Sequence, residues 1–301
     1  MLTEAEVKGI YIPVVTPFKA DEELDRESYV QYLEHLLAQP IQGLVVNGTT
    51  GEAPTVVWDE VEELVRLTQD TMNRLNRRLP LVVGTGTNST ASTIRQTEWA
   101  GQLGADAVLI TAPYYNRPSA EGVIGHYRRA AEVGVPVIAY ENPGRTGNRL
   151  AVDTVRSVLE LDGVIGLKDS SGGIGLIAEL ARTGSKPVLC GDDALFYAML
   201  CHGATGGILA TANVRTASFA EVSELGTSGD LAGARRAFEP LVPMIRKLMQ
   251  ESNPAPLKWV LAEQGHMASD TLRAPMTTIS EGLKRELRDM AEIGWKEIEL
   301  I

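Results

Sequence analysis

The sequence VIGLKDSSGG, at residues 164–173, places Lys168 between an apolar run and a polar, glycine-rich turn. A short apolar run that ends at turn residues is typical of a strand buried on both faces. The charge of a lysine at such a strand end must be paired, reach water or be lost with its proton. Two interpretations follow from this window alone. The lysine either forms a salt bridge, for example with Asp169, or supplies a neutral amine that attacks a carbonyl carbon to form a Schiff base.

Similar apolar runs recur along the chain and alternate with amphipathic stretches. The expected strands are 9–15, 43–47, 81–84, 107–111, 135–140, 164–168, 187–191 and 206–210. Patterns of helical periodicity between them include 59–73, 90–103, 120–133 and 194–202. Eight strand–helix units in series predict an α/β fold, a parallel sheet closed into a (β/α)8 TIM barrel. An open doubly wound sheet is the alternative, but no GxGxxG sequence follows the first expected strand.

The strand pattern stops after Thr211, and the rest of the chain has helical patterns. The expected helices are 217–225, 231–250, 256–263 and 281–295. This tail is too long to be only the last helix of a barrel. We therefore predict a catalytic barrel at residues 1–215 and a helical extension at residues 216–301, packed on the barrel or on a neighbouring subunit.

Composition narrows the class of protein. The 301 residues are 44% hydrophobic and 22% charged, which is ordinary for a globular enzyme. The net charge of −11 argues against a nucleic-acid partner or an anionic membrane surface. The acidic N-terminus lacks the apolar segment of a signal peptide, and no apolar run approaches the roughly 20 residues that span a bilayer. We expect a cytoplasmic protein with no membrane or nucleic-acid partner.

Residue types that bind metals are few and scattered. The two cysteines, Cys190 and Cys201, form no CxxC sequence, and the four histidines stand singly. A disulfide framework and a zinc site are therefore both unsupported. We expect an enzyme without a metal and without a cofactor.

In a parallel barrel, catalytic groups lie at the carboxyl ends of the strands. Thr49 and Thr50 follow the second expected strand, and Tyr140 ends the fifth. A Schiff-base enzyme needs a nucleophilic lysine, a proton shuttle and hydrogen-bond donors for the carboxylate of a 2-oxo acid. Lys168, Tyr140 and the two threonine hydroxyls are suited to these three roles.

Each of these features also has an alternative interpretation. Tyr140 is equally explained as an aromatic residue of the core. Residues 49–52 can be an N-cap for the helix that follows, and Arg145 can be a surface charge. A phosphosugar enzyme is a further alternative, with its phosphate site at Gly191 and residues 203–207, although those loops carry no lysine or arginine. A non-catalytic ligand-binding barrel is the alternative from another class.

Taken together, these residues resemble the dihydrodipicolinate synthase and N-acetylneuraminate lyase family of class I aldolases. The resemblance covers essentially the whole chain, through motifs at residues 14–18, 48–52, 113–118, 166–168, 191–193, 253–259 and 272–276. It implies imine chemistry in a TIM barrel without a cofactor, and self-association as a homodimer or homotetramer. In this family, Lys168 would form the imine with pyruvate. Tyr140 would shuttle protons, relayed through Thr50 and through Tyr115 of a neighbouring subunit.

The resemblance also implies a set of substrate-binding residues. Thr49 and Thr50 would hold the carboxylate of pyruvate. Arg145 would bind the carboxylate of the second substrate, which in the synthase branch is L-aspartate 4-semialdehyde, on the diaminopimelate route to lysine. Gly191 and Ile208, at the ends of the seventh and eighth expected strands, complete the expected set.

The chain departs from the family pattern in two places. Glu141-Asn142 follows Tyr140, where the synthases usually carry Asn or Asp and then a β-branched residue. An alternative is therefore a paralogous pyruvate-dependent aldolase or dehydratase that acts on another aldehyde or 2-oxo (sugar) acid. Lysine-inhibited members carry polar residues at positions 53, 58, 61, 88, 92 and 114, and here only Asn88 and Tyr114 match. We predict that feedback inhibition by lysine is weak or absent.

Overall fold

The structure is a computed structural model that describes residues 1–292 and 294. These residues form two compact units, which are described in turn. The first unit consists of Met1–Tyr11, Gln42–Val46 and Leu79–Leu209, and the second of Ile12–Ile41, Asn47–Arg78 and the described residues from Ala210 onward. The domain boundary expected between residues 215 and 216 stays a prediction.

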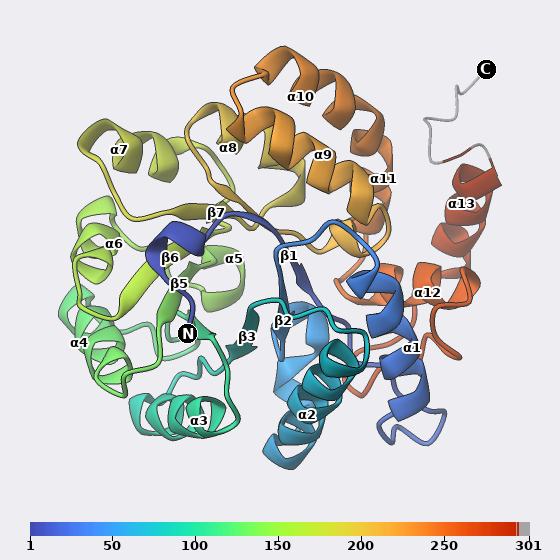
Figure 1. The fold of residues 1–301 in the computed structure, drawn as a ribbon, viewed down its shortest axis with the longest axis horizontal. Helices are drawn as coiled ribbons and strands as arrows, with labels where there is room; N and C mark the ends of the chain where they lie inside the picture. Colours follow the sequence, from blue (N-terminus) through green and yellow to red (C-terminus); the bar gives the residue numbers. More distant parts are fainter. Residues whose placement is uncertain (293, 295–301) are drawn as a thin grey trace. The chain divides into compact units, whose positions relative to one another are not determined.

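Eight parallel strands close into a barrel in the order in which they occur in the chain (Figure 1). They are β1 Gly9–Pro13, β2 Gly43–Val46, β3 Leu81–Gly84, β4 Ala107–Thr111, β5 Val137–Glu141, β6 Val164–Asp169, β7 Val188–Cys190 and β8 Gly206–Ile208. Pairing of Gly9 with Gly206 joins β1 to β8 and closes the ring. The predicted α/β TIM barrel is confirmed, and the open doubly wound sheet is excluded.

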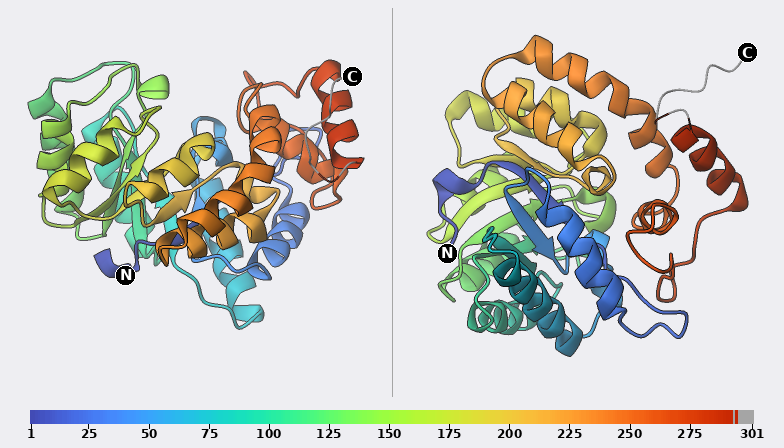
Figure 2. Two further views of the ribbon diagram at one scale, coloured as in Figure 1. Left: turned by 90° about the horizontal axis from the view of Figure 1, so that it is seen from above. Right: turned by 45° about the vertical axis from the view of Figure 1, so that its right-hand side comes forward.

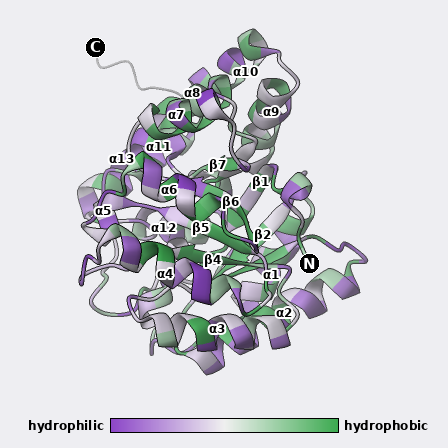
Figure 3. Cartoon of the chain, turned by 90° about the vertical axis from the view of Figure 1, so that its left-hand side faces the viewer, coloured by the Kyte–Doolittle hydropathy of each residue, from purple (hydrophilic) through white to green (hydrophobic). Residues whose placement is uncertain are grey.

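The strands form because their residues are apolar on both faces. Every residue of β2 (GLVV) and of β3 (LVVG) is buried. Figure 3 shows β4, β5 and β6 mostly in the hydrophobic colour, whereas α3 and α4 carry hydrophilic patches on their outer sides. This pattern is what a parallel barrel requires, since side chains fill its interior and helices cover its outside.

The expected strands 81–84 and 107–111 are confirmed at both ends, and the other six differ from the observed strands by one or two residues at their ends. The expected strand 135–140 begins at Val137, because Pro136 has no N–H to donate to a neighbouring strand. The strand that carries Lys168 extends to Asp169, which pairs with Glu141 of β5. The lysine therefore lies inside the hydrogen-bonded ladder, one residue before its end.

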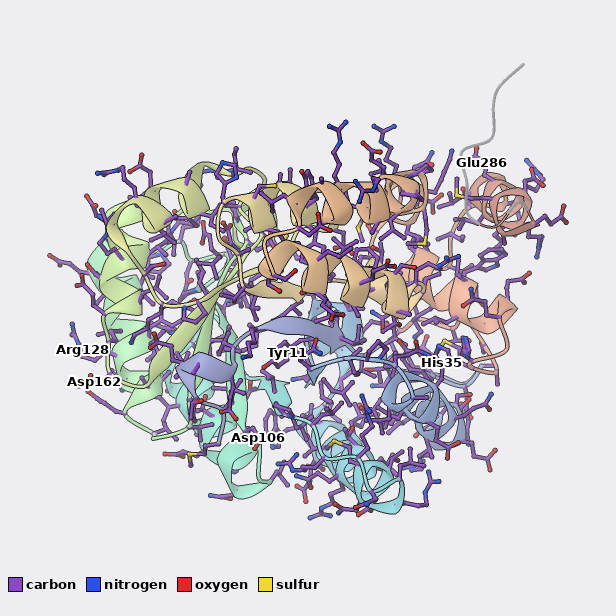
Figure 4. The ribbon with its side chains drawn as sticks, turned by 45° about the horizontal axis from the view of Figure 1, so that its top comes forward. Tyr11, His35, Asp106, Arg128, Asp162 and Glu286 are labelled. Atoms are coloured by element: carbon purple, nitrogen blue, oxygen red, sulfur yellow. The ribbon has the colours of Figure 1, made fainter. Side chains whose placement is uncertain are left out.

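Large side chains fill the barrel interior. Tyr11, labelled in Figure 4, is fully buried on β1, and its hydroxyl donates to the carbonyl oxygen of Glu6 at 3.0 Å. A Cβ at Gly43 would lie 2.3 Å from the Tyr11 ring, so the glycine makes room for this phenol. Asp106, also labelled, accepts a 2.9 Å hydrogen bond from the backbone N–H of Leu81 and fixes the start of β3.

The helices of the first unit follow its strands along the chain. They are α3 Thr90–Gln102, α4 Ala120–Ala131, α5 Pro143–Thr146, α6 Val152–Leu159, α7 Gly175–Thr183 and α8 Phe196–Cys201. Figure 1 shows α3, α4, α6 and α7 as an arc outside β5, β6 and β7. The side chains of Ser89 and Ser119 accept backbone N–H groups in the first turns of α3 and α4, which sets where both helices begin.

The second unit is helical. Its helices are α1 Arg26–Leu37, α2 Trp58–Arg74, α9 Thr216–Thr227, α10 Leu231–Phe238, α11 Val242–Leu248, α12 Ala255–Glu263 and α13 Glu281–Glu292. α9 packs against α10, and α11 contacts α13 (Figure 2). The helical character expected for the tail is confirmed.

One expected helix of the tail is wrong. The pattern at 231–250 is two helices, α10 and α11, separated by the 3-10 turn Glu239–Leu241. Pro240 and Pro243 cannot donate a backbone N–H, so they break the helical hydrogen-bond ladder there. The end expected for the last helix, at residue 295, lies outside the described residues.

The remaining regular elements are short. Other 3-10 turns are Glu4–Glu6, Thr49–Gly51, Ala53–Thr55, Asp193–Leu195 and Thr211–Asn213. None of the helices in residues 1–292 combines the length and the apolarity that crossing a membrane requires.

Candidate active site

Lys168 and Tyr140 lie side by side on neighbouring strands of the barrel. They are register partners on β6 and β5, so their side chains leave the sheet at the same level and on the same face. Nζ of Lys168 lies 4.3 Å from the centroid of the Tyr140 ring. Each residue is 7% exposed. The structure therefore brings together the predicted nucleophile and the predicted proton shuttle in a buried setting.

Several neighbouring groups favour ionisation of the Tyr140 phenol. Burial is the largest single influence and opposes ionisation, but the ammonium of Lys168, a hydrogen bond from Asn142, the Ser170 hydroxyl and the charge of Arg145 together outweigh it. Nδ2 of Asn142 lies 2.6 Å from the phenol oxygen. The pKa of Tyr140 is consequently below its ordinary value. A phenol with a lowered pKa is suited to move protons near neutral pH.

Arg145 stands on a short turn that begins beside this phenol. Asn142 is the N-cap of α5, and its Oδ1 accepts the backbone N–H of Arg145 at 3.2 Å. The Thr146 hydroxyl donates to the backbone carbonyl of Asn142 at 3.0 Å. Arg145 itself is exposed, and its charge also lowers the pKa of Tyr140. The predicted carboxylate-binding arginine thus belongs to the surroundings of the lysine–tyrosine pair.

Glu141 and Asp169 are neighbours of this pair in the sequence but belong to the opposite face of the sheet. They are register partners on β5 and β6, and successive side chains of a strand alternate between faces. Oδ1 of Asp169 accepts the backbone N–H of Ser171 at 2.8 Å, and no ion pair joins Asp169 to Lys168 within the described chain. The salt bridge considered for Lys168 is therefore not formed.

Glu141 is a buried carboxyl group that forms no ion pair among the described residues. Its Oε1 accepts the backbone N–H of Leu150 at 2.9 Å, and its Oε2 has no hydrogen-bond partner among residues 1–292. Burial raises the pKa of Glu141 to about 7, and the nearby charge of Asp169 adds to this effect. Strand alternation alone would have placed Glu141 on the outer face, although its environment was not evident from the sequence.

Gly191 and Ile208 shape the space around Lys168 and Tyr140. A Cβ at Gly191 would lie 2.6 Å from Cε of Lys168 and 2.3 Å from Oγ of Ser170. A side chain at position 191 would therefore displace the side chains of Lys168 and Ser170. Ile208 is buried in the same hydrophobic cluster as Tyr140. Their positions fit walls of a small binding site, and their contact with a substrate stays a prediction.

Tyr115 is not part of this buried group within one chain. It follows β4, has a positive φ of 66°, and is 91% exposed. The neighbouring Asn116 holds the loop by donating to the carbonyl oxygen of Asn88 at 2.8 Å. The role expected for Tyr115 in a neighbouring subunit stays a prediction.

Thr49 and Thr50 belong to the second unit, in the 3-10 turn Thr49–Gly51. Nδ2 of Asn253 donates to Oγ1 of Thr50 at 3.2 Å, and the Thr16 hydroxyl donates to the carbonyl oxygen of Gly51 at 2.7 Å. The turn does not cap the helix that follows, since the N-cap of α2 is Val57. These contacts fix the turn at Thr50 and at Gly51.

A buried ion pair lies directly after this turn. Glu52 adopts the left-handed conformation, and its Oε1 lies 2.7 Å from Nζ of Lys258 on α12. Lys258 is completely buried, and its Nζ also donates to the carbonyl oxygen of Thr16 at 2.8 Å. Burial lowers the pKa of Lys258 to about 8, an effect that Glu52 opposes. The backbone N–H of Arg273 donates to the second carboxylate oxygen at 3.2 Å.

The described residues contain no cluster of three or more His, Cys, Asp or Glu side chains suited to hold a metal ion. The groups that surround Lys168 and Tyr140 are instead an amide, a guanidinium and apolar side chains. Such a lining is suited to a small organic acid.

A sequence model of the dihydrodipicolinate synthetase family matches residues 6–293 of this chain. The 4-hydroxy-tetrahydrodipicolinate synthase of Ralstonia nicotianae is 37% identical over 286 residues, which cover 94% of this chain and 96% of that protein. The 4-hydroxy-tetrahydrodipicolinate synthase of Thiobacillus denitrificans is 39% identical over 284 residues, which cover 93% of this chain and 95% of that protein. The expected family resemblance is confirmed over almost the whole length.

Solved structures show the same similarity. Dihydrodipicolinate synthase of Thermotoga maritima superposes with a TM-score of 0.90 at 35% identity, covering 96% of this chain and 99% of that chain. The chloride-inhibited dihydrodipicolinate synthase of Acinetobacter baumannii, in complex with pyruvate, gives a TM-score of 0.91 at 34% identity. That superposition covers 95% of this chain and 98% of the other.

Proposed function

The chain belongs to the dihydrodipicolinate synthetase family of class I aldolase-type lyases, and we propose that it condenses pyruvate with L-aspartate 4-semialdehyde. The product would be 4-hydroxy-tetrahydrodipicolinate, with release of water, a step on the diaminopimelate route to lysine. The observation that supports this proposal most is the pairing of Lys168 with Tyr140 on adjacent strands. An amine and an acid–base group in contact are what imine formation requires.

Lys168 reacts as the neutral amine, after its ammonium has given a proton to the ionised Tyr140 phenol beside it. Its nitrogen attacks the C2 carbonyl of pyruvate, and the resulting carbinolamine loses water to give the imine. The hydroxyl that leaves needs a proton, and the Tyr140 phenol beside Nζ is the group that supplies it. The ionised phenol can then accept a proton in a later step, so Tyr140 acts first as a proton donor and then as a proton acceptor.

The imine draws electrons away from the methyl carbon of the bound pyruvate. Loss of a methyl proton gives an enamine, and its nucleophilic carbon attacks the aldehyde carbon of the second substrate. The amino group of that substrate then attacks the imine carbon and closes the ring. This last step displaces Lys168 and returns the enzyme to its free form.

Two carboxylates must be held during these steps. We assign the pyruvate carboxylate to Thr49 and Thr50, with Thr50 as the relay to Tyr140, because their turn is fixed by Asn253 and Thr16. We assign the carboxylate of the second substrate to Arg145, whose guanidinium suits bidentate binding. Gly191 and Ile208 would close the walls of the site.

Tyr115 supports a proposal about assembly. A tyrosine that is 91% exposed at a loop is available to a second copy of the chain. We assign it to the active site of a neighbouring subunit in a homodimer or homotetramer. Sedimentation velocity should then show a dimer or tetramer, and Tyr115→Phe should lower turnover without changing the sedimentation coefficient. A fully active monomer would remove Tyr115 from the mechanism.

The proposed function is tested by a coupled assay with pyruvate, L-aspartate 4-semialdehyde, dihydrodipicolinate reductase and NADPH. NADPH consumption should require both substrates and should disappear in Lys168→Ala. If NADPH is not consumed but borohydride traps pyruvate on Lys168, the imine chemistry holds and the acceptor is another aldehyde or 2-oxo acid. Absence of both signals would reject the proposal. Half-inhibition by sub-millimolar lysine in this assay would contradict the predicted weak feedback.

A further inference from the structure

Asn142 connects the phenol of Tyr140 to the turn that carries Arg145. Its Nδ2 lies 2.6 Å from the Tyr140 oxygen, and its Oδ1 lies 3.2 Å from the backbone nitrogen of Arg145. The backbone carbonyl of Asn142 accepts the Thr146 hydroxyl at 3.0 Å, which fixes the residue from a third side. One half-buried side chain therefore joins the proton shuttle to the predicted acceptor-binding arginine.

The helix cap decides which end of the amide meets the phenol. A backbone N–H can only donate, so the end of Asn142 that faces Arg145 must be the oxygen. The nitrogen must then face Tyr140, and an amide nitrogen can only donate. The phenol oxygen is consequently an acceptor in this contact. A donor at 2.6 Å favours the ionised phenol over the neutral one.

We propose that Asn142 is a positioning residue for Tyr140, which holds the phenol oxygen as a hydrogen-bond acceptor and ties it to the Arg145 turn. This inference rests on the proposed role of Tyr140 as the proton shuttle. Asn142 does not exchange protons with the substrate itself. Together with the ammonium of Lys168, the Ser170 hydroxyl and the charge of Arg145, it lowers the pKa of Tyr140. It also holds the shuttle and the acceptor-binding arginine in one arrangement.

Asn142→Ser separates the two contacts. A serine N-cap can still accept the backbone N–H of Arg145, but its shorter side chain does not reach the Tyr140 phenol. Asn142→Ala removes both contacts. Asn148→Ser is the matched control, because Asn148 lies in the same loop and its side chain donates to the Pro118 carbonyl oxygen instead.

The first readout is a spectrophotometric titration of tyrosinate in the resting enzyme. Subtracting the titration of Tyr140→Phe isolates Tyr140 from the other tyrosines. Asn142→Ser should move the Tyr140 midpoint upward by about one pH unit, because one hydrogen bond to the phenolate is lost. Asn148→Ser should leave the midpoint where it is in the wild type.

The second readout is exchange of the pyruvate methyl protons with deuterium, which needs no second substrate. Its pH profile should shift in Asn142→Ser in the same direction as the titration. The KM for the aldehyde should change little in Asn142→Ser and rise several-fold in Asn142→Ala, since only alanine also releases the Arg145 turn. Thermal melts would show that Asn142→Ser is folded, so the test does not depend on the alanine variant.

An unchanged Tyr140 midpoint in Asn142→Ser would overturn the inference, and so would an equal shift in Asn148→Ser. Failure of the proposed function gives a different result. If imine formation itself fails, the wild-type enzyme shows no methyl exchange. If only the acceptor differs, exchange persists and the coupled NADPH assay gives no signal. In both cases the titration still reports whether Asn142 donates to Tyr140.

Discussion

Glu52 and Glu141 are both buried glutamates, one after a barrel strand and one at the end of a barrel strand. They differ in whether a cation compensates the carboxylate charge. Glu52 faces the ammonium of Lys258 at 2.7 Å and also receives the backbone N–H of Arg273. Among the described residues, Glu141 accepts the backbone N–H of Leu150 and forms no ion pair, and the charge of Asp169 raises its pKa more than that of Arg149 lowers it. The first is a complete ion pair, whereas the second is a carboxyl group that burial drives toward its neutral form.

This difference shows that the partner of a buried carboxylate, and not burial itself, decides whether its charge stabilises or destabilises the folded protein. The Glu52–Lys258 pair adjoins the turn that carries Thr49 and Thr50, which we propose as the binding site of the pyruvate carboxylate. Glu141, which follows Tyr140, makes the free energy of unfolding depend on pH around neutrality. Four substitutions test this comparison, in order of expected effect.

Lys258→Met should have the largest effect, a loss of about 3–5 kcal/mol in the free energy of unfolding, because it leaves Glu52 buried and uncompensated. Urea unfolding at pH 7 measures this loss. The double variant Lys258→Met/Glu52→Leu should recover much of it, since both charges are then absent. The control is Lys247→Met, whose partner Glu286 is half exposed. A loss in Lys258→Met no larger than in the control would show that the buried pair stabilises the fold no more than a surface pair does.

Glu141→Gln should remove a pH dependence. The pKa of Glu141 is raised from 4.5 to about 7 in the folded protein, so the unfolded state loses this proton at lower pH than the folded state. Its contribution to stability is therefore present below pH 4.5 and lost as pH rises through about 7. At pH 8, Glu141→Gln should be more stable than the wild type by roughly 2–3 kcal/mol, and at pH 5 the difference should be much smaller.

Chemical unfolding at both pH values checks this prediction. Glu132→Gln, at an exposed carboxylate after α4, is the matched control and should show no such pH dependence. If Glu141→Gln and wild type differ equally at pH 5 and pH 8, Glu141 does not titrate near neutrality.

Arg273→Lys should have an intermediate effect, about 1–2 kcal/mol, because a lysine cannot replace the guanidinium fork. Nη1 and Nη2 of Arg273 contact the two carboxylate oxygens of Glu60, and Nη1 also donates to the carbonyl oxygen of Thr55. Arg273 and Glu60 are each about one-sixth exposed, so their exposure lies between that of the buried Glu52–Lys258 pair and that of surface ion pairs. An effect as large as that of Lys258→Met would show that burial does not rank these pairs.

Glu179→Gln should have the smallest effect, below about 0.5 kcal/mol, since its partner Arg182 and the glutamate itself are largely exposed. Thermal unfolding at low and high salt checks this, and the small difference from wild type should vanish at high salt. A loss above 1 kcal/mol would contradict the dependence on burial.

The contact between Lys168 and Tyr140 could be predicted from the sequence. Consecutive strands of a parallel barrel are neighbours, so residues at the ends of the fifth and sixth strands must meet. The break between α10 and α11 could also be read from Pro240 and Pro243. These features depend on short-range patterns and on a fold whose strand order follows the chain.

The surroundings of these residues could not be predicted. Glu52 and Lys258 are 206 residues apart, and no local pattern identifies a partner over that distance. The orientation of the Asn142 amide depends on α5, a turn of four residues that is too short to show helical periodicity. Such pairings depend on tertiary packing and become visible only in the structure.

The central claim is that Lys168 forms an imine with pyruvate, and borohydride trapping tests it most directly. The protein is incubated with pyruvate and borohydride, digested, and its peptides are analysed by mass spectrometry. The account predicts one reduced pyruvate adduct, on the peptide that contains Lys168, and no adduct in Lys168→Ala. Absence of an adduct, or an adduct on another lysine such as Lys258, would contradict it.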